Sequence, residues 1–335
     1  MTEDRAPLQG MSLEFLGKPF GRALIALLFI VCLGLIFNAD GTFFRWETHR
    51  DMLRQISTYG ILASGLTVVI VSGGIDLSVG SMLGLAAVTF SMLSIHQGWA
   101  AGVAVGGSLA LGLFCGALMG GCVGRFGIQP FIATLAGMVL LRGVAKWVSG
   151  GQKVSTTVLG RGGAFEQITL PPIFDLLGAR LLHQNLATVT LIFLFCLLGC
   201  WVLLACTKWG RWLFAIGGNE VCAHLSGIPV TRVKLLAYGL SGLLAAVAGI
   251  CQAVQELQGD PEAGMGYELT AIAIVVLGGT SLSGGGGGIG LTLLGTITIG
   301  YLEKILSINA VGEASRLMMT GLIVLTAVLM QKRRS

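Results

Sequence analysis

The sequence predicts an all-α integral membrane protein with about ten transmembrane helices. Three properties of its composition support this prediction. Of the 335 residues, 54% are hydrophobic, only 11% are charged, and 52 are glycine. So few charges cannot cover the surface of a soluble domain, whereas lipid-facing helices need almost none. The same composition excludes a disordered chain, a disulfide-stapled secreted module and a nucleic-acid binder that relies on basic patches.

Ten apolar segments approach the length of about 20 residues that a helix needs to cross a bilayer. They are expected at 22–38, 56–72, 77–95, 99–122, 128–148, 186–206, 234–255, 269–283, 287–306 and 315–331. The first has no cleavage site after it, so it is interpreted as a retained span rather than a signal peptide. An even number of spans places both termini on one side of the membrane.

The domain organisation follows from these spans and from the positions of lysine and arginine. Basic residues flank the 207–233 connection and form the tail, so this side of the membrane is predicted to be cytoplasmic. The expected parts are a cytoplasmic N-terminal segment (1–21), a transmembrane permease domain (22–331) with an external loop (149–185) and a cytoplasmic coupling loop (207–233), and a basic cytoplasmic tail (332–335).

Four glycines recur at intervals of four residues in one predicted span: Gly112, Gly116, Gly120 and Gly124. Residues four apart lie on one face of a helix. Helices in lipid associate through close backbone contact over such small residues, because lipid tails give them little hydrophobic reason to pair. The spacing therefore predicts a helix-packing face, and it identifies no substrate.

A glycine-rich pattern occurs twice in the chain. Residues 73–80, which read Gly-Gly-Ile-Asp-Leu-Ser-Val-Gly, match 278–285 at five of eight positions. Paired, glycine-interrupted segments in the two halves of a transporter indicate the transport path, although chance matching in a glycine-rich chain is the alternative. The candidate path residues are Gly73, Gly74, Asp76, Ser78, Gly278, Gly279, Ser281 and Ser283. Asp76 is equally suited to capping a helix that begins at Leu77.

The cytoplasmic loop is predicted to contain a helix of about two turns. Asn219 can cap its start, Glu220 suits its first turn, and Gly227 can end it, with Pro229 just beyond. A helix this short is not stable alone, so something is expected to pack on it. An ordinary surface helix is the alternative.

Motifs for catalysis and for resident cofactors are missing from the sequence. No Gly-x-x-x-x-Gly-Lys-Ser/Thr phosphate loop, metal-ligand cluster or catalytic motif occurs. Cys196 and Cys200 share a helical face, but no histidine or carboxylate lies beside them, so they are interpreted as packing residues. The chain is therefore predicted not to be an enzyme and to hold no cofactor or metal.

Several stretches together resemble the permease subunits of bacterial ABC importers for ribose, xylose and related monosaccharides. The stretches lie at 72–80, 129–135, 215–220, 225–228, 240–243, 267–269 and 276–285. The resemblance implies a type II importer bundle of about ten helices in the bacterial inner membrane. It also implies a second permease copy or paralogue and a periplasmic sugar-binding protein outside. Inside, it implies an ABC ATPase subunit or a fused double ATPase that binds ATP and Mg²⁺.

The resemblance further assigns the short cytoplasmic helix as the coupling helix that inserts into the ATPase. Its candidate residues are Gly218, Asn219, Glu220, Ala223, Leu225, Ser226 and Gly227. An ion-coupled secondary transporter of a small polar solute is the alternative function. That alternative needs titratable groups along the path, and only Asp76 is a fair candidate.

Overall fold

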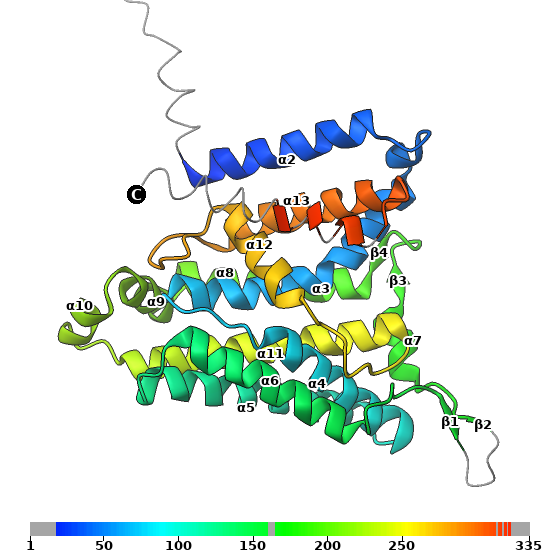
Figure 1. The fold of residues 1–335 in the computed structure, drawn as a ribbon, viewed down its shortest axis with the longest axis horizontal. Coiled ribbons are helices and arrows are strands. Elements are labelled where there is room, and N and C mark those ends of the chain that lie inside the picture. The colour runs from blue at the N-terminus through cyan, green and yellow to red at the C-terminus, as the bar shows by residue number, and fades with distance from the viewer. Residues whose placement is uncertain (1–17, 160–164, 313, 317, 320, 323–335) are drawn as a thin grey trace, which may run out of the picture.

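The computed structural model describes residues 18–159, 165–312, 314–316, 318, 319, 321 and 322. Within them, eight helical segments are long and apolar enough to cross a membrane. They are α2 (Pro19–Ile36), α3 (Trp46–Val71), α4 (Val79–Ser91) with its π-helical extension η2 (Met92–His96), α5 (Ala101–Arg125), α6 (Pro130–Val148), α8 (Thr188–Cys206), α11 (Val230–Glu256) and α13 (Ile289–Ile308). Figure 1 shows these helices running back and forth between two ends of the molecule.

One end is formed by the connections 72–78, 126–129, 207–229 and 279–288, and we call it the α10 end after the short helix at its tip. It also carries α9 (Lys208–Gly218) and α10 (Glu220–Leu225). The other connections lie at the opposite end, as Figure 1 shows. The alternation of long helices is the one that the apolar segments predict.

The central helices are α3, α4 and α11, which are the most deeply buried of the eight. Helix α11 packs against α5, α4 and α3, and α13 packs against α3, α12 and α2. Helices α2, α5, α6 and α8 leave most of their residues at least partly exposed. A bundle with an exposed apolar periphery matches a bilayer, where no water penalises such a surface.

One predicted span is wrong in its length. The segment 269–283 was expected to cross the membrane, but α12 (Tyr267–Gly278) has only 12 residues. Gly279 follows with a positive φ of 102°, which turns the chain out of the helix. The glycines that extend the apolar run therefore form a loop rather than helix. The predicted span 315–331 lies largely outside the described residues.

The remaining elements are short. The predicted external loop contains α7 (Pro172–Gly178) and two antiparallel pairs, β1 (Thr157–Leu159) with β2 (Phe165–Gln167), and β3 (Arg180–Leu181) with β4 (Leu186–Ala187). A 3₁₀ turn, η1 (Thr42–Phe44), connects α2 to α3. All of them lie at the opposite end, where they connect or cover the long helices.

Candidate functional site

Helix α10 is held at both of its ends by its own sequence. The Asn219 side chain accepts the N–H of Cys222 at 2.9 Å and so caps the first turn. Glu220 in that turn forms an ion pair with Lys234 of α11 at 2.6 Å. Gly227 ends the helix region with a φ of 79°, which favours glycine. The predicted short helix is thus present between these residues and tied to the base of α11.

The outer face of α10 carries two large apolar side chains. Val221 and Leu225, four residues apart, are 69% and 80% exposed, whereas Ala223 between them is 4% exposed and packs inward. Ser226 donates from its hydroxyl to the Cys222 carbonyl at 2.8 Å and closes the last turn. Two large apolar side chains at the tip of the molecule present a contact surface that this chain itself does not cover.

The sequence prediction missed α9, which leads directly into α10. Thr207 caps α9 by accepting the N–H of Gly210 at 3.2 Å, and Leu213 and Ile216 are buried beneath it. The spacing of these apolar residues was a usable signal. It was hidden because the helix follows the α8 span after a single residue.

Glycines from three distant segments meet beneath α10, and we call Gly73, Gly217, Gly284 and Gly285 the glycine junction. The Gly285 N–H donates to the Val71 carbonyl at the end of α3 at 3.0 Å. A β-carbon added to Gly217 would come within 2.5 Å of the Gly285 nitrogen, and one added to Gly284 within 2.8 Å of the Gly73 Cα. The α3–α4 and α12–α13 connections therefore touch each other and the end of α9 at atomic contact.

The eight candidate path residues divide between this junction and the protein interior. Gly73 is in the junction, and Gly74 packs next to Tyr238 of α11. Gly278 and Gly279 end α12, where they approach α13 and the start of α2. Ser281 and Ser283 shape the loop above them, since the Ser281 N–H donates to the Gly286 carbonyl at 3.1 Å and the Ser283 N–H to the Ser281 hydroxyl at 3.3 Å. The structure thus brings the two repeated segments together at the α10 end.

Asp76 and Ser78 are fully buried between α4 and α11. The Asp76 carboxylate accepts the Ser78 N–H at 3.0 Å, the Ser78 hydroxyl at 2.5 Å and the Ser241 hydroxyl of α11 at 2.9 Å. The expectation that Asp76 caps a helix starting at Leu77 needs correction, because α4 begins two residues later at Val79. Its carboxylate instead fixes the bend before α4 and ties that bend to α11.

The four spaced glycines of α5 all face α11. A β-carbon on Gly112 would lie 2.5 Å from the Ala246 Cβ, and one on Gly120 would lie 2.8 Å from the Leu235 Cα. One on Gly116 would overlap the Tyr238 carbonyl oxygen, and one on Gly124 would lie 3.2 Å from the Thr231 Cα. Gly124 also accepts a hydrogen bond on its carbonyl from the Thr231 hydroxyl, at 2.8 Å. The small residues allow the two backbones to approach, and α5–α11 is the most extensive helix contact in the described structure.

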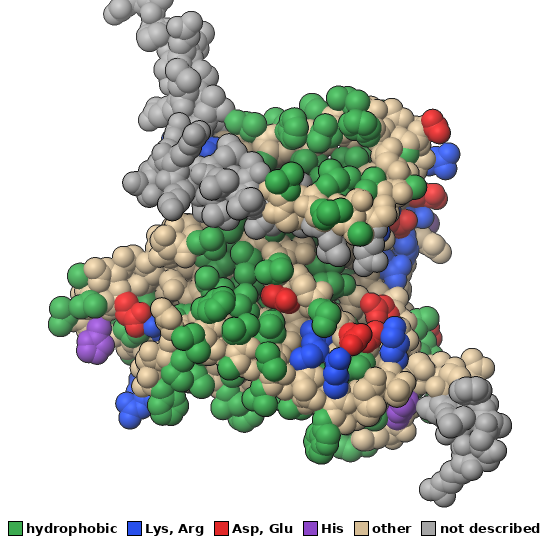
Figure 2. Space-filling view, viewed as in Figure 1, with side chains coloured by type: hydrophobic (Ala, Val, Ile, Leu, Met, Phe, Trp, Pro, Cys, Tyr) green, Lys and Arg blue, Asp and Glu red, His purple; other side chains and the backbone are tan. Residues whose placement is uncertain are grey.

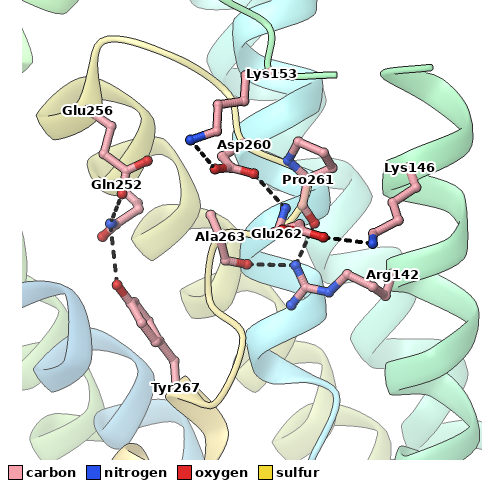
Figure 3. Close-up of polar contacts among 10 residues, drawn as sticks. All are labelled: Arg142, Lys146, Lys153, Gln252, Glu256, Asp260, Pro261, Glu262, Ala263 and Tyr267. Carbon is pink, nitrogen blue, oxygen red and sulfur yellow. Dashed lines mark hydrogen bonds and ion pairs between the residues drawn. The ribbon is translucent and has the colours of Figure 1, made fainter. Parts of the chain in front are cut away.

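A polar clasp joins α6 to the α11–α12 connection at the opposite end (Figure 3). The Arg142 Nη1 donates to the Pro261 and Ala263 carbonyls at 2.6 and 2.7 Å. Next to these hydrogen bonds, Lys146 forms an ion pair with Glu262 at 2.8 Å, and Lys153 forms one with Asp260 at 3.0 Å. We define the polar clasp as these seven groups: Arg142, Lys146, Lys153, Asp260, Pro261, Glu262 and Ala263.

The clasp satisfies backbone carbonyls that lie outside any helix. Lys153 is exposed, and its hydrogen bond and charge attraction to Asp260 raise the pKa of its ammonium group. Sequence reasoning missed this site, although the signal was present: Arg142 is a cation inside the predicted 128–148 span, and such a group needs a partner or water.

The described part of the chain contains no group of three or more histidine, cysteine, aspartate or glutamate side chains arranged to hold a metal ion. The eight cysteines are all free thiols in the structure, Cys196 and Cys200 included. The site candidates are therefore the α10 surface, the glycine junction and the polar clasp.

Comparison with known proteins gives two consistent results. The family described as the branched-chain amino acid transport system permease component matches residues 50–327. The ribose import permease protein RbsC of Escherichia coli K12 is 39% identical over 316 residues, covering 93% of this chain and 94% of the relative.

Two further relatives match over most of their length. The Bacillus subtilis ribose import permease protein RbsC is 39% identical, covering 85% of this chain and 84% of the relative. The Escherichia coli K12 xylose transport system permease protein XylH is 32% identical, covering 93% and 92%. No solved structure matches the chain.

Proposed function

The chain belongs to the family of permease components of branched-chain amino acid transport systems, and from that premise we propose that it is the membrane-spanning subunit of an ABC importer for a monosaccharide such as ribose. A periplasmic binding protein would deliver the sugar. ATP, with Mg²⁺, would be hydrolysed on separate ATPase subunits, and two permeases, identical or paralogous, would form the pathway. The observation that carries the proposal is the exposed apolar surface of α10.

The orientation follows from the role proposed for α10. A helix that contacts a cytoplasmic ATPase must lie on the cytoplasmic side of the bacterial inner membrane. The α10 end is then cytoplasmic, and the polar clasp is near the periplasm, where the binding protein docks. Since α2 starts at the α10 end, the proposal puts the start of α2 on the cytoplasmic side as well.

The glycine junction offers a route from α10 to the membrane helices. ATPase closure would push α10 and, through α9, displace Gly217 against the Gly285–Val71 contact. Packed backbones without side chains between them cannot absorb such a movement, so the ends of α3, α4, α12 and α13 would have to follow it. The pathway would then alternate between outward and inward openings.

Charge reversal at Glu220 tests the coupling role. The native Glu220 carboxylate pairs with the Lys234 ammonium at 2.6 Å. Glu220→Lys replaces this attraction with repulsion between two cations, which should release α10 from α11. We expect at least a tenfold loss of ribose uptake, about 1.4 kcal/mol in the coupling equilibrium, in membranes that contain the ATPase and binding protein. The permease should still insert and accumulate normally.

The matched control is Glu166→Lys, which makes the same charge change in exposed β2 at the opposite end. Normal ATP-driven uptake by Glu220→Lys would dismiss the coupling role. Uptake that persists when the partner's ATP hydrolysis is blocked would favour the ion-coupled alternative.

A further inference from the structure

Two side chains of opposite charge border a hollow in the surface of the bundle. The hollow measures about 230 Å³ and opens between α4, α6 and α12. Its lining residues are Ser81, Met138, Val139, Arg142, Met265 and Glu268. Figure 2 shows charged side chains gathered over the outer part of this face, with apolar side chains around them.

The depth of these charges excludes lipid as their normal neighbour. Arg142 lies twelve residues into α6, about 18 Å from its start at a rise of 1.5 Å per residue. Glu268 lies ten residues before the end of α12, about 15 Å from the α10 end by the same rise. Both positions fall inside the apolar thickness of about 30 Å, where ionised side chains face water, protein or a transported solute rather than acyl chains.

The hollow is built into the fold rather than left over from loose packing. Two glycines one turn apart on α4 make room for the two charges. A β-carbon on Gly84 would lie 2.6 Å from the Arg142 Nη1, and one on Gly80 would overlap the Glu268 carboxylate. The wall of α4 is therefore bare backbone at the two points where the charged groups sit.

The donor and acceptor geometry suits a hydroxylated ligand. The hydrogen bonds of Arg142 to described residues use Nη1 alone, so the guanidinium plane is fixed while Nη2 and Nε remain as donors. No ion pair within 4.0 Å joins Arg142 to Glu268 among the described residues, so the two charges border the hollow without closing it.

One positive and one negative group give this hollow no preference for an ion of either sign. A neutral polyol can accept from the guanidinium and donate to the carboxylate at once. The methionine and valine side chains can lie against its C–H faces.

We propose that Arg142 and Glu268 form a contact site for a neutral polyhydroxylated solute, a monosaccharide, on its way through the membrane. This inference rests on the proposed importer function and assigns the residues of this chain that touch the cargo.

The test uses the complete importer, with its ATPase and binding protein, in proteoliposomes. Arg142→Gln and Glu268→Gln are compared with Arg45→Gln and Glu47→Gln, which remove the same charges from exposed positions. We expect the initial rate of labelled D-ribose uptake to fall about tenfold in the two site variants, from the loss of charged hydrogen bonds. ATP hydrolysis stimulated by ribose-loaded binding protein should stay within about twofold of the wild type in all four.

Loss of uptake with ATP hydrolysis retained supports the contact site. Retained uptake in both variants, or a parallel loss of uptake and ATP hydrolysis, would overturn it, because the latter indicates a purely structural role. A wild-type complex without ribose-stimulated ATP hydrolysis would instead count against the importer function, and the contact site would fall with it.

A second measurement does not depend on activity. Met265→Cys at the hollow and Phe195→Cys on α8 replace apolar residues that are 66% and 77% exposed. In a cysteine-free chain that still transports ribose, a charged, water-soluble thiol reagent should modify Met265→Cys only, and excess D-ribose should slow it. Equal modification of both positions, or of neither, would contradict a solvated site.

Discussion

Among single residues, Asp76 has the most unusual environment, because its carboxylate is completely buried with only neutral donors around it. Ser78 gives it two hydrogen bonds and Ser241 gives it a third. A buried carboxylate is tolerated only when such donors replace water. These hydrogen bonds connect the segment before α4 to α11, which is a structural role. A carboxylate held in this way is poorly placed to carry protons for an ion-coupled mechanism.

Asp76→Ala removes the common acceptor of the three donors. The Ser78 and Ser241 hydroxyls lose their partner inside the bundle, which should lower the free energy of unfolding by about 1–3 kcal/mol. Thermal unfolding of the purified protein in detergent measures the change. Asp175→Ala, at an exposed position of α7, is the control, and an equal unfolding temperature for the two variants would contradict the structural role of Asp76.

At the scale of elements, the contact between α5 and α11 depends on glycines, which have no side chain to separate the two backbones. Gly112 and Gly116 approach Gly242 of α11 so closely that any β-carbon would overlap the opposite backbone. Gly121 of the same helix instead faces open space, with nothing within 4 Å of an added β-carbon. One helix therefore offers a packing glycine and a free glycine for direct comparison.

Gly116→Ala should separate the two helices and lower stability by about 1–3 kcal/mol, as overpacking does in other cores. Gly121→Ala should raise stability by up to about 1 kcal/mol, since alanine favours helix more than glycine does. Unfolding temperatures in detergent should thus move in opposite directions. Shifts of the same sign would show that the α5–α11 contact does not limit stability.

The sequence was a good guide wherever a periodic pattern decides the structure. Apolar length located α2 to α6, α8, α11 and α13, and the spacing of four indicated one packing face on α5. It failed at α12, because composition cannot show that Gly279 turns the chain. It also missed the polar clasp, whose partners are more than a hundred residues apart and include backbone carbonyls that no sequence pattern marks.

At the scale of the whole molecule, the repeated glycine motif acquires a spatial meaning. Its two copies begin 205 residues apart (278 minus 73), yet the chain brings them into contact beneath α10. Movement of α9 and α10 therefore reaches helices from both halves of the chain at one point. The sequence could identify the two copies but not their contact, which only the fold of the bundle brings about.

Gly217→Ala tests whether this contact transmits movement. The added methyl group would press on Gly285 and on the Val71 carbonyl and displace α9. We expect the number of ribose molecules imported per ATP hydrolysed to fall about tenfold, because a shift of about 1.4 kcal/mol between coupled states is enough.

Gly218→Ala is the folding control, since no atom lies within 4 Å of a β-carbon added there. Its unfolding temperature should match that of the wild type. An unchanged transport ratio in Gly217→Ala would exclude the glycine junction as the route of coupling.

The brevity of α12 also bears on how the protein is made. Its 12 residues extend about 18 Å, well short of the hydrocarbon layer, so on its own it is a poor signal for insertion. We therefore expect the newly synthesised chain to insert α12 and α13 together, as a hairpin whose glycine-rich connection (279–288) carries no charge. Insertion of α12 and α13 is thus expected to be one joint event rather than two independent ones.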